Sequence, residues 1–199
     1  GKSTVVNMLI GAYRPKAGEV TVGGKPLESV TREAYYSHIA SVSYNTYIFN
    51  DSVRANFGLA KKNVSDEEIW AALEKVNLAG FIKENGGLDK VITEDANNVS
   101  GGQKQRLALA VNLVADKDIY VFDEATSNID IESEAIIMRN IKAMSAEKSV
   151  IVISHRLANV VPADNIYFME EGEVKESGSH AQLMSAQGGY AKLFNAQKE

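Results

Sequence analysis

The chain has 199 residues, of which 45% are hydrophobic and 24% are charged, and this balance is typical of a folded globular domain. It contains no cysteine, which excludes disulfides, thiolate metal sites and cysteine nucleophiles. The formal net charge of −5 disfavours nucleic acid as a partner. No apolar run approaches the roughly 18 to 20 residues that a membrane-spanning helix needs.

Short helical and extended segments alternate over the first 50 residues. The apolar run 4–10 predicts a helix, 19–22 predicts a strand that enters a turn at Gly23-Gly24, and 39–42 predicts a second strand. The chain starts with Gly1-Lys2-Ser3-Thr4, which lacks the Met and the apolar segment of a signal peptide.

Residues 51–115 are predicted to form helices only. Ser65 and Glu68 have the spacing of a capping box, in which each side chain bonds the other residue's backbone N–H at the start of a helix. A longer helix is predicted at 100–115. We interpret 51–115 as a helical subdomain inserted into the rest of the fold.

The remaining residues return to an alternation of strands and helices. Apolar strands are predicted at 119–122 and 150–153, and between them Ile131, Ala135, Met138 and Ile141 recur at helical spacing over 131–144. Apolar strands separated by helices indicate a mainly parallel sheet with helices on both faces, which defines an α/β protein.

A hairpin is predicted at 166–169 and 173–175, and two short helices follow it. We therefore expect three parts: 1–50 and 116–199 would form one core, and 51–115 would be the inserted helical subdomain.

The first motif is Gly1-Lys2-Ser3-Thr4 at the start of a predicted helix. It matches the second half of a P-loop, whose backbone N–H groups surround phosphates, whose Lys reaches the β- and γ-phosphates and whose Ser binds Mg²⁺. The alternative is an ordinary exposed N-terminus.

The second motif is a strand, 119–122, that ends in Asp123-Glu124. Ligands bind at the carboxyl edge of parallel sheets, where such an Asp can hold Mg²⁺ and the next acid can activate water. A strand that simply ends in a polar turn is the alternative. His155 follows the next predicted strand, where a structural role is the alternative to a catalytic one.

The third motif is Val99-Ser100-Gly101-Gly102-Gln103-Lys104-Gln105-Arg106, directly before a helix. Ser is a good helix cap, and the glycines permit close approach of another group. A glycine-rich helix start explains the glycines but not the whole octapeptide. Here the chain closely resembles the nucleotide-binding domain of ABC transporters, whose signature is Ser-Gly-Gly-Gln. The resemblance covers essentially the whole chain, and the segments 48–54 and 178–180 resemble the exporter branch.

The resemblance implies a fold, a P-loop NTPase-like α/β core, and an activity, the hydrolysis of ATP with Mg²⁺ that powers export. It implies two partners, a second nucleotide-binding domain and transmembrane domains, and a location at the cytoplasmic face of the cell membrane. The resemblance implies that Gly1, Lys2 and Thr4 bind phosphates and that Ser3 and Asp123 bind Mg²⁺. It implies that Glu124 is the general base, that His155 contacts the γ-phosphate and that Asp130 couples the two sites. The partner's ATP site would be completed by the signature residues Ser100, Gly101, Gly102 and Gln103.

The sequence departs from the family pattern in two places. Tyr44 stands where the glutamine of the Q-loop is expected, and Asn45 is adjacent to it. Glu94 corresponds to an acidic loop residue of exporters, but Asp95 and Ala96 replace the surrounding glycines. The first half of the P-loop would precede Gly1, so we expect the isolated 199-residue polypeptide to bind ATP weakly or not at all.

Two alternatives remain at this stage: a regulatory half-site that binds nucleotide with weak hydrolysis, motivated by Tyr44, and an ABC ATPase that does not act in transport. We interpret Trp70 and the pair Tyr35-Tyr36 as packing residues, and Lys104 and Arg106 as a solvated helix face.

Overall fold

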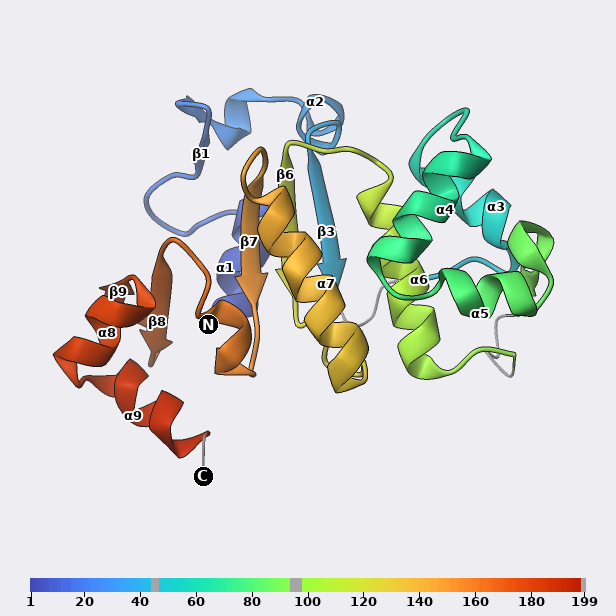
Figure 1. Ribbon diagram of the computed structural model, residues 1–199. Coiled ribbons are helices and arrows are strands. Elements are labelled where there is room, and N and C mark those ends of the chain that lie inside the picture. Colours follow the sequence, from blue (N-terminus) through green and yellow to red (C-terminus); the bar gives the residue numbers. More distant parts are fainter. Residues whose placement is uncertain (44–46, 94–97, 198–199) are drawn as a thin grey trace. The chain divides into compact units, whose positions relative to one another are not determined.

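The computed structural model describes residues 1–43, 47–93 and 98–197 (Figure 1). Tyr44, Asn45, Glu94, Asp95 and Ala96 lie outside the described residues. The chain forms two compact units, one of Gly1–Ser37 with Val152–Glu199 and the other of His38–Ile151.

The first unit begins with a helix and a tight hairpin. Its first elements are α1 (Lys2–Leu9), β1 (Thr21–Val22), β2 (Lys25–Pro26), the 3₁₀ helix η1 (Leu27–Ser29) and α2 (Arg32–Tyr36). Gly23 and Gly24 join β1 to β2 with φ of 57° and 75°, values that glycine adopts without strain. The predicted turn is therefore confirmed.

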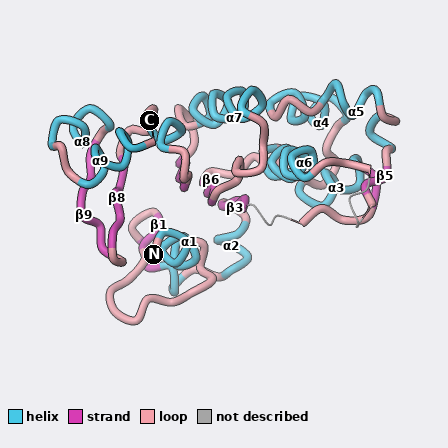
Figure 2. Tube along the Cα trace, turned by 90° about the horizontal axis from the view of Figure 1, so that it is seen from below, coloured by secondary structure: helices cyan, strands magenta, loops and turns pink. Residues whose placement is uncertain are grey.

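The same unit ends with a hairpin and two helices. They are η3 (Leu157–Val160), β8 (Ile166–Glu170), β9 (Glu173–Gly178), α8 (His180–Ala186) and α9 (Gly189–Ala196). Figure 2 shows α8 and α9 beside this hairpin. Ile166, Leu183, Tyr190 and Phe194 form their shared apolar core. The predicted hairpin and the two predicted helices are confirmed.

Tyr35 and Tyr36 differ in environment, although both were expected to pack. The Tyr35 ring is buried and its hydroxyl donates to the backbone oxygen of Leu9 at 2.6 Å. Tyr36 is 46% exposed. Its ring centre lies 6.2 Å from that of Tyr35, so Tyr36 packs through part of its surface, because neighbouring residues in a short helix point in different directions.

A three-stranded sheet organises the second unit. Its order is β3 (Ile39–Ser43), β6 (Ile119–Asp123), β7 (Ser149–Ile153), and the last two residues of β7 are assigned to the first unit. β3 and β6 are parallel, with Ile39 opposite Ile119 and Ser43 opposite Asp123. The buried side chains of Val121 and Phe122 lie in the central strand. The parallel sheet and the helices confirm the α/β class.

Helices make up most of the rest of this unit. They are α3 (Val53–Ala60), α4 (Asp66–Lys75), α5 (Ala79–Glu84), η2 (Gly87–Asp89), α6 (Gly101–Leu113) and α7 (Ile131–Met144). The capping box of Ser65 and Glu68 is present at the start of α4. Trp70 is half-buried beneath the Lys83 ammonium, which lies 5.2 Å from the ring centre. No helix of the described ranges is long and apolar enough to cross a membrane.

The expectation that 51–115 contains helices only is wrong. β4 (Asp51–Ser52) pairs antiparallel with β5 (Val91–Ile92). This pairing satisfies backbone groups that precede α3, and two-residue strands leave no periodic pattern in a sequence.

The helix predicted over 131–144 is confirmed as α7, but its apolar residues differ in burial. Ile131 is 78% exposed and Ala135 is exposed, whereas Ser133 and Glu134 are 1% and 6% exposed. Ile141 is buried. The polar residues are buried at the start of this helix because they bind the loop before it, which is described below.

Candidate functional site

The first predicted motif lies at the N-terminus of α1. Gly1 caps this eight-residue helix, and Lys2, Ser3 and Thr4 are exposed in its first turn. The first N–H groups of a helix lack intrahelical acceptors, and the helix dipole favours negative charge there. The first turn of α1 therefore offers backbone donors, an ammonium and two hydroxyls to an anion.

A buried carboxylate oxygen lies at the end of β6. Oδ1 of Asp123 is buried and has no hydrogen-bond partner within the described ranges. An unpaired buried polar atom is costly unless a ligand or water satisfies it. A carboxylate oxygen is a donor that Mg²⁺ prefers, so the environment of Asp123 fits a magnesium ligand. The described part of the chain holds no cluster of three or more His, Asp or Glu side chains that would form a complete metal site by itself.

Glu124 follows directly and has an unusual backbone. Its φ is 54°, in the left-handed region, which costs a residue other than glycine about 1–2 kcal/mol. The backbone turns sharply after it, since its carbonyl accepts from Ser127 N at 3.1 Å and Thr126 O accepts from Ile129 N at 3.2 Å. The sheet edge thus carries two adjacent carboxylates, those of Asp123 and Glu124. Because the backbone at Glu124 is unfavourable, other contacts must hold it in place.

The signature residues form the predicted helix start. Ser100 caps α6: its hydroxyl accepts from Gln103 N at 3.2 Å, and Gln103 Oε1 accepts from Ser100 N at 2.7 Å. Space is open around Gly101, where an added Cβ would meet nothing within 4 Å. The hydroxyl hydrogen of Ser100 and the N–H groups of the first turn can face an anion.

The next turn of α6 contacts the loop that follows β6. Gln105 donates through Nε2 to Glu124 O at 3.4 Å, and its Oε1 accepts from Asn128 N at 3.2 Å. A Cβ on Gly102 would come within 3.0 Å of Asn128 O, so this glycine permits the close approach. Sequence reasoning missed the role of Gln105. The i, i+3 spacing of Gly102 and Gln105 was the available signal, because it places both on one face of the helix.

The far end of this loop is fixed by a polar cluster at the start of α7. Asp130 caps the helix, with Oδ1 accepting from Ser133 N at 2.8 Å. This bond, a second one from the Ser133 hydroxyl and the nearby Arg106 guanidinium lower the pKa of the Asp130 carboxyl from its ordinary 3.8. Arg106 Nη1 lies 3.9 Å from Asp130 Oδ2.

Arg106 is not on a solvated face, which corrects the prediction for this residue. Its side chain is only 13% exposed, and Nη1 donates to Ser133 Oγ at 2.6 Å and to Asn77 O at 2.9 Å. The guanidinium thus joins α6 to two segments that are distant from it in the sequence. A charged residue that follows a helical signature gives no local sign of such partners, so the sequence alone indicates exposure.

His155 belongs to the first unit and is exposed. Its backbone carbonyl accepts from Gln197 Nε2 at 2.7 Å, and Gln197 Oε1 accepts from Leu157 N at 3.0 Å. The Ser154 hydroxyl accepts from Arg156 N at 3.0 Å and from Asn159 Nδ2 at 3.3 Å. The backbone around the histidine is therefore held from both sides.

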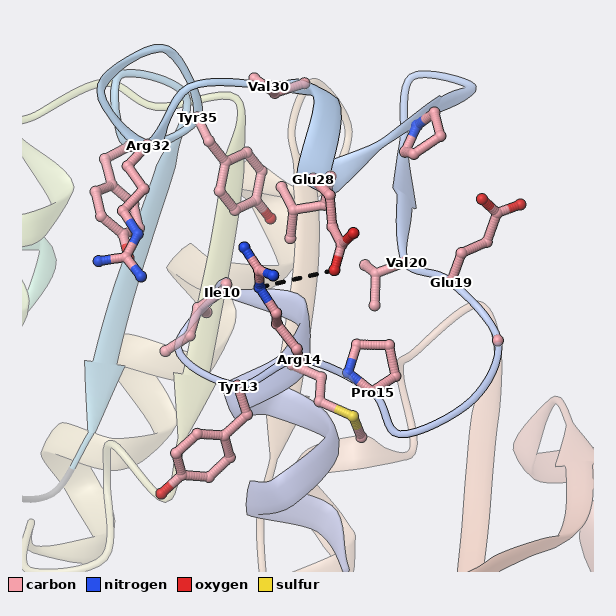
Figure 3. A pocket seen from close by; sticks show the side chains of 16 residues that line it. Ile10, Tyr13, Arg14, Pro15, Glu19, Val20, Glu28, Val30, Arg32 and Tyr35 are labelled. Atoms are coloured by element: carbon pink, nitrogen blue, oxygen red, sulfur yellow. Dashed lines mark ion pairs between the residues drawn. The ribbon is translucent and has the colours of Figure 1, made fainter.

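A pocket of about 230 Å³ also lies in the first unit, beside the C-terminal end of α1 (Figure 3). Tyr13, Tyr35 and Arg32 line it, and Arg14 Nε lies 3.7 Å from Glu28 Oε1 across it. None of the predicted site residues lines this pocket. It is separate from the phosphate motif, because an eight-residue helix places its two ends about 12 Å apart.

The predicted residues are thus divided between the two units. Lys2, Ser3 and His155 belong to the first, and Asp123, Glu124, Asp130 and Ser100 to the second. Within the second unit, α6 contacts the loop that carries Glu124, so the signature and the acidic strand end are one connected structure.

Comparison with known proteins identifies the family to which this chain is similar. The family model described as ABC transporter matches residues 1–127. An uncharacterized ABC transporter ATP-binding protein of Haemophilus influenzae is 45% identical over 199 residues, which are 100% of this chain and 36% of that protein. A multidrug resistance ABC transporter ATP-binding and permease protein of Lactococcus lactis is 38% identical over 200 residues, covering 99% of this chain and 34% of that protein.

A solved structure is similar over the whole chain. It is described as a bacterial Atm1-family ABC exporter with ATP bound, and it has a TM-score of 0.95, 32% identity, and coverage of 100% of this chain and 35% of that one. The chain therefore spans about a third of the length of these proteins.

Proposed function

The chain belongs to the ABC transporter family, and we propose that it is the ATP-binding and ATP-hydrolysing domain of an exporter. ATP-driven association of two such domains would move a substrate through transmembrane domains, with this domain at the cytoplasmic face of the cell membrane. The similarity to an exporter with ATP bound and to a protein that combines ATP-binding and permease parts supports this proposal.

The observation that carries the proposal is the edge of the sheet at β6. There Asp123 has a buried oxygen without a hydrogen-bond partner in the described part of the chain, and Glu124 follows it on a constrained turn. Phosphoryl transfer needs a metal ligand and a residue that orients or deprotonates water, and these two carboxylates can supply both.

We assign the following roles within this mechanism. Lys2, Gly1 and Thr4 would bind phosphates at the start of α1, and Glu124 would take the proton from the attacking water. His155 would contact the γ-phosphate. Asp123 and Ser3 would hold Mg²⁺, which neutralises phosphate charge when bound. Preorganised N–H groups at the start of α1 would stabilise the charge that remains.

The start of α6 would bind the nucleotide that is held by the partner domain. Ser100, Gly101, Gly102 and Gln103 would complete the ATP site of a partner domain, and Asp130 would couple the two sites. The open space at Gly101 is consistent with a ligand that approaches the helix start closely. The division into a core of 1–50 with 116–199 and an inserted 51–115 remains part of the proposal.

Replacing the proposed base tests this function. In the whole protein that carries this domain, Glu124→Gln should lower the ATP hydrolysis rate by about 10²–10⁴-fold, because the amide cannot accept the proton. Binding of radiolabelled ATP should persist. The measurement is steady-state phosphate release with Mg²⁺ present.

Glu147→Gln is the matched control, because Glu147 is an exposed carboxylate in the turn between α7 and β7. It should leave the rate unchanged. Hydrolysis by the Glu124→Gln protein at the rate of the unmodified protein would contradict the assignment.

A further inference from the structure

The amide of Gln105 joins the signature helix to two points of the loop that carries the proposed base. Nε2 donates to Glu124 O at 3.4 Å, and Oε1 accepts from Asn128 N at 3.2 Å. The side chain is 6% exposed, so water does not readily replace either bond. Both ends of the amide are therefore committed to the backbone of one turn.

Glutamine suits this position for a chemical reason. Its amide is a donor and an acceptor at once, whereas a glutamate side chain has only acceptors when ionised and a leucine side chain has neither. The two backbone groups that face it are a carbonyl and an N–H, which need one donor and one acceptor. The contact thus depends on the amide and not only on the volume of the side chain.

Neighbouring residues of α6 strengthen the same connection. Gly102 allows Asn128 O to approach, since an added Cβ would lie 3.0 Å from that oxygen. Arg106 binds Ser133 Oγ and lies near Asp130, where the loop ends. The helix therefore contacts the loop near its beginning, in its middle and at its end.

The loop needs such support at Glu124. The left-handed φ of 54° is unfavourable for a glutamate and persists only where surrounding contacts determine it. The Gln105 bond falls on the carbonyl of this same residue. This carbonyl also accepts from Ser127 N at 3.1 Å within the turn, so loss of the Gln105 bond would remove its connection to α6 and loosen the peptide unit that orients the Glu124 side chain.

We propose that Gln105 is a positioning residue, which fixes the backbone of Glu124 to the signature helix. The proposal rests on the proposed function, in which Glu124 acts on one nucleotide and the start of α6 contacts the other. The Gln105 side chain then connects the helix that contacts one nucleotide, α6, to the residue that acts on the other, Glu124. A displacement of α6 by one nucleotide moves the base that acts on the other.

Two substitutions separate the donor from the acceptor. Gln105→Leu removes both and keeps a similar volume, whereas Gln105→Glu keeps an acceptor for Asn128 N and loses the donor to Glu124 O. The whole protein is used for two measurements: hydrogen exchange at the Asn128 amide, and kcat and KM for ATP.

Gln105→Leu should remove the protection of the Asn128 amide and lower kcat about tenfold, because a small misplacement of a catalytic group is costly. Its KM should change less than about twofold, since the groups that bind ATP are untouched. Gln105→Glu should keep the protection of Asn128 and still lower kcat.

Asn112→Ala is the control on the same helix. The Asn112 amide donates to Ala108 O at 2.9 Å, within α6. This variant should keep both the exchange protection and kcat.

Two results would overturn the proposal: a Gln105→Leu protein with a protected Asn128 amide and an unchanged kcat, or a loss of kcat that Asn112→Ala shares in equal measure. If the unmodified protein hydrolyses no ATP, the proposed function fails instead. The Asn128 exchange still decides whether Gln105 holds the loop.

Discussion

The loops after β6 and β7 carry the proposed catalytic side chains Glu124 and His155, but they are held in different ways. Buried groups hold the first: Gln105, Thr126 and Glu134 are 6%, 7% and 6% exposed. The second is held largely at the surface, where Gln197 is exposed and bonds the backbone of His155. A buried bond has no water to replace it, whereas an exposed one does. Changes at the first loop should therefore affect stability and activity together, and changes at the second should affect mainly activity.

The largest effect on stability is expected at Glu134, whose Oε1 accepts from the Thr126 hydroxyl at 2.7 Å in a buried site. Glu134→Leu should lower the free energy of unfolding by about 1–3 kcal/mol, because the hydroxyl loses its acceptor. Glu134→Gln should cost less, since its amide oxygen can still accept. Urea unfolding of the three proteins measures the difference.

Thr126→Val provides the matched control for this bond. If the pair acts as a unit, the double variant with Glu134→Leu should cost less than the sum of the single variants. A Glu134→Leu protein as stable as the unmodified one would remove the basis of the comparison between the two loops.

A smaller effect is expected at Gln197, the exposed support of the second loop. Gln197→Ala should change the free energy of unfolding by less than about 0.5 kcal/mol, as is usual for surface positions. It should lower the hydrolysis rate two- to threefold, roughly the effect of one solvent-exposed hydrogen bond. Steady-state hydrolysis and urea unfolding are measured on the same preparation.

Gln187→Ala is a suitable control for Gln197→Ala, because Gln187 is an exposed glutamine in the turn after α8. Its left-handed backbone is equally unfavourable for alanine, so any effect should be confined to stability. If Gln197→Ala lowered the free energy of unfolding as much as Glu134→Leu does, the distinction between a loop held by buried groups and a loop held by exposed groups would be wrong.

The sequence predicts the segments whose signals are local. Helix 131–144 has the predicted bounds, and the caps at Ser65 and Ser100 form as expected, because caps depend on residues three positions apart. The alternation of apolar strands with helices was sufficient to identify the α/β class.

The contacts that hold the candidate site depend on partners distant in the sequence. The Arg106 side chain is only 13% exposed because it meets Asn77 and Ser133. Ile131 is exposed, whereas Glu134 is buried, where its carboxylate accepts from the Thr126 hydroxyl. Helical spacing predicts that a face is buried but not which polar residues it holds. The supports of a strained loop are therefore the part of the site that sequence reasoning missed.

The smallest effect is expected from Asp130, at the end of the first loop, and it concerns pH. Its pKa lies below the ordinary 3.8 because it accepts from Ser133, so its stabilising contribution is complete above that pH and is lost as the pH falls through the lowered value. Asp130→Asn should keep the cap, since Asn and Asp cap helices equally well, and should reduce the loss of stability below pH 3.8. Urea unfolding at several acidic pH values measures this slope. The same slope in both proteins would show that the carboxylate contributes nothing to holding the loop, which would leave its support to Gln105, Arg106 and the pair of Thr126 with Glu134.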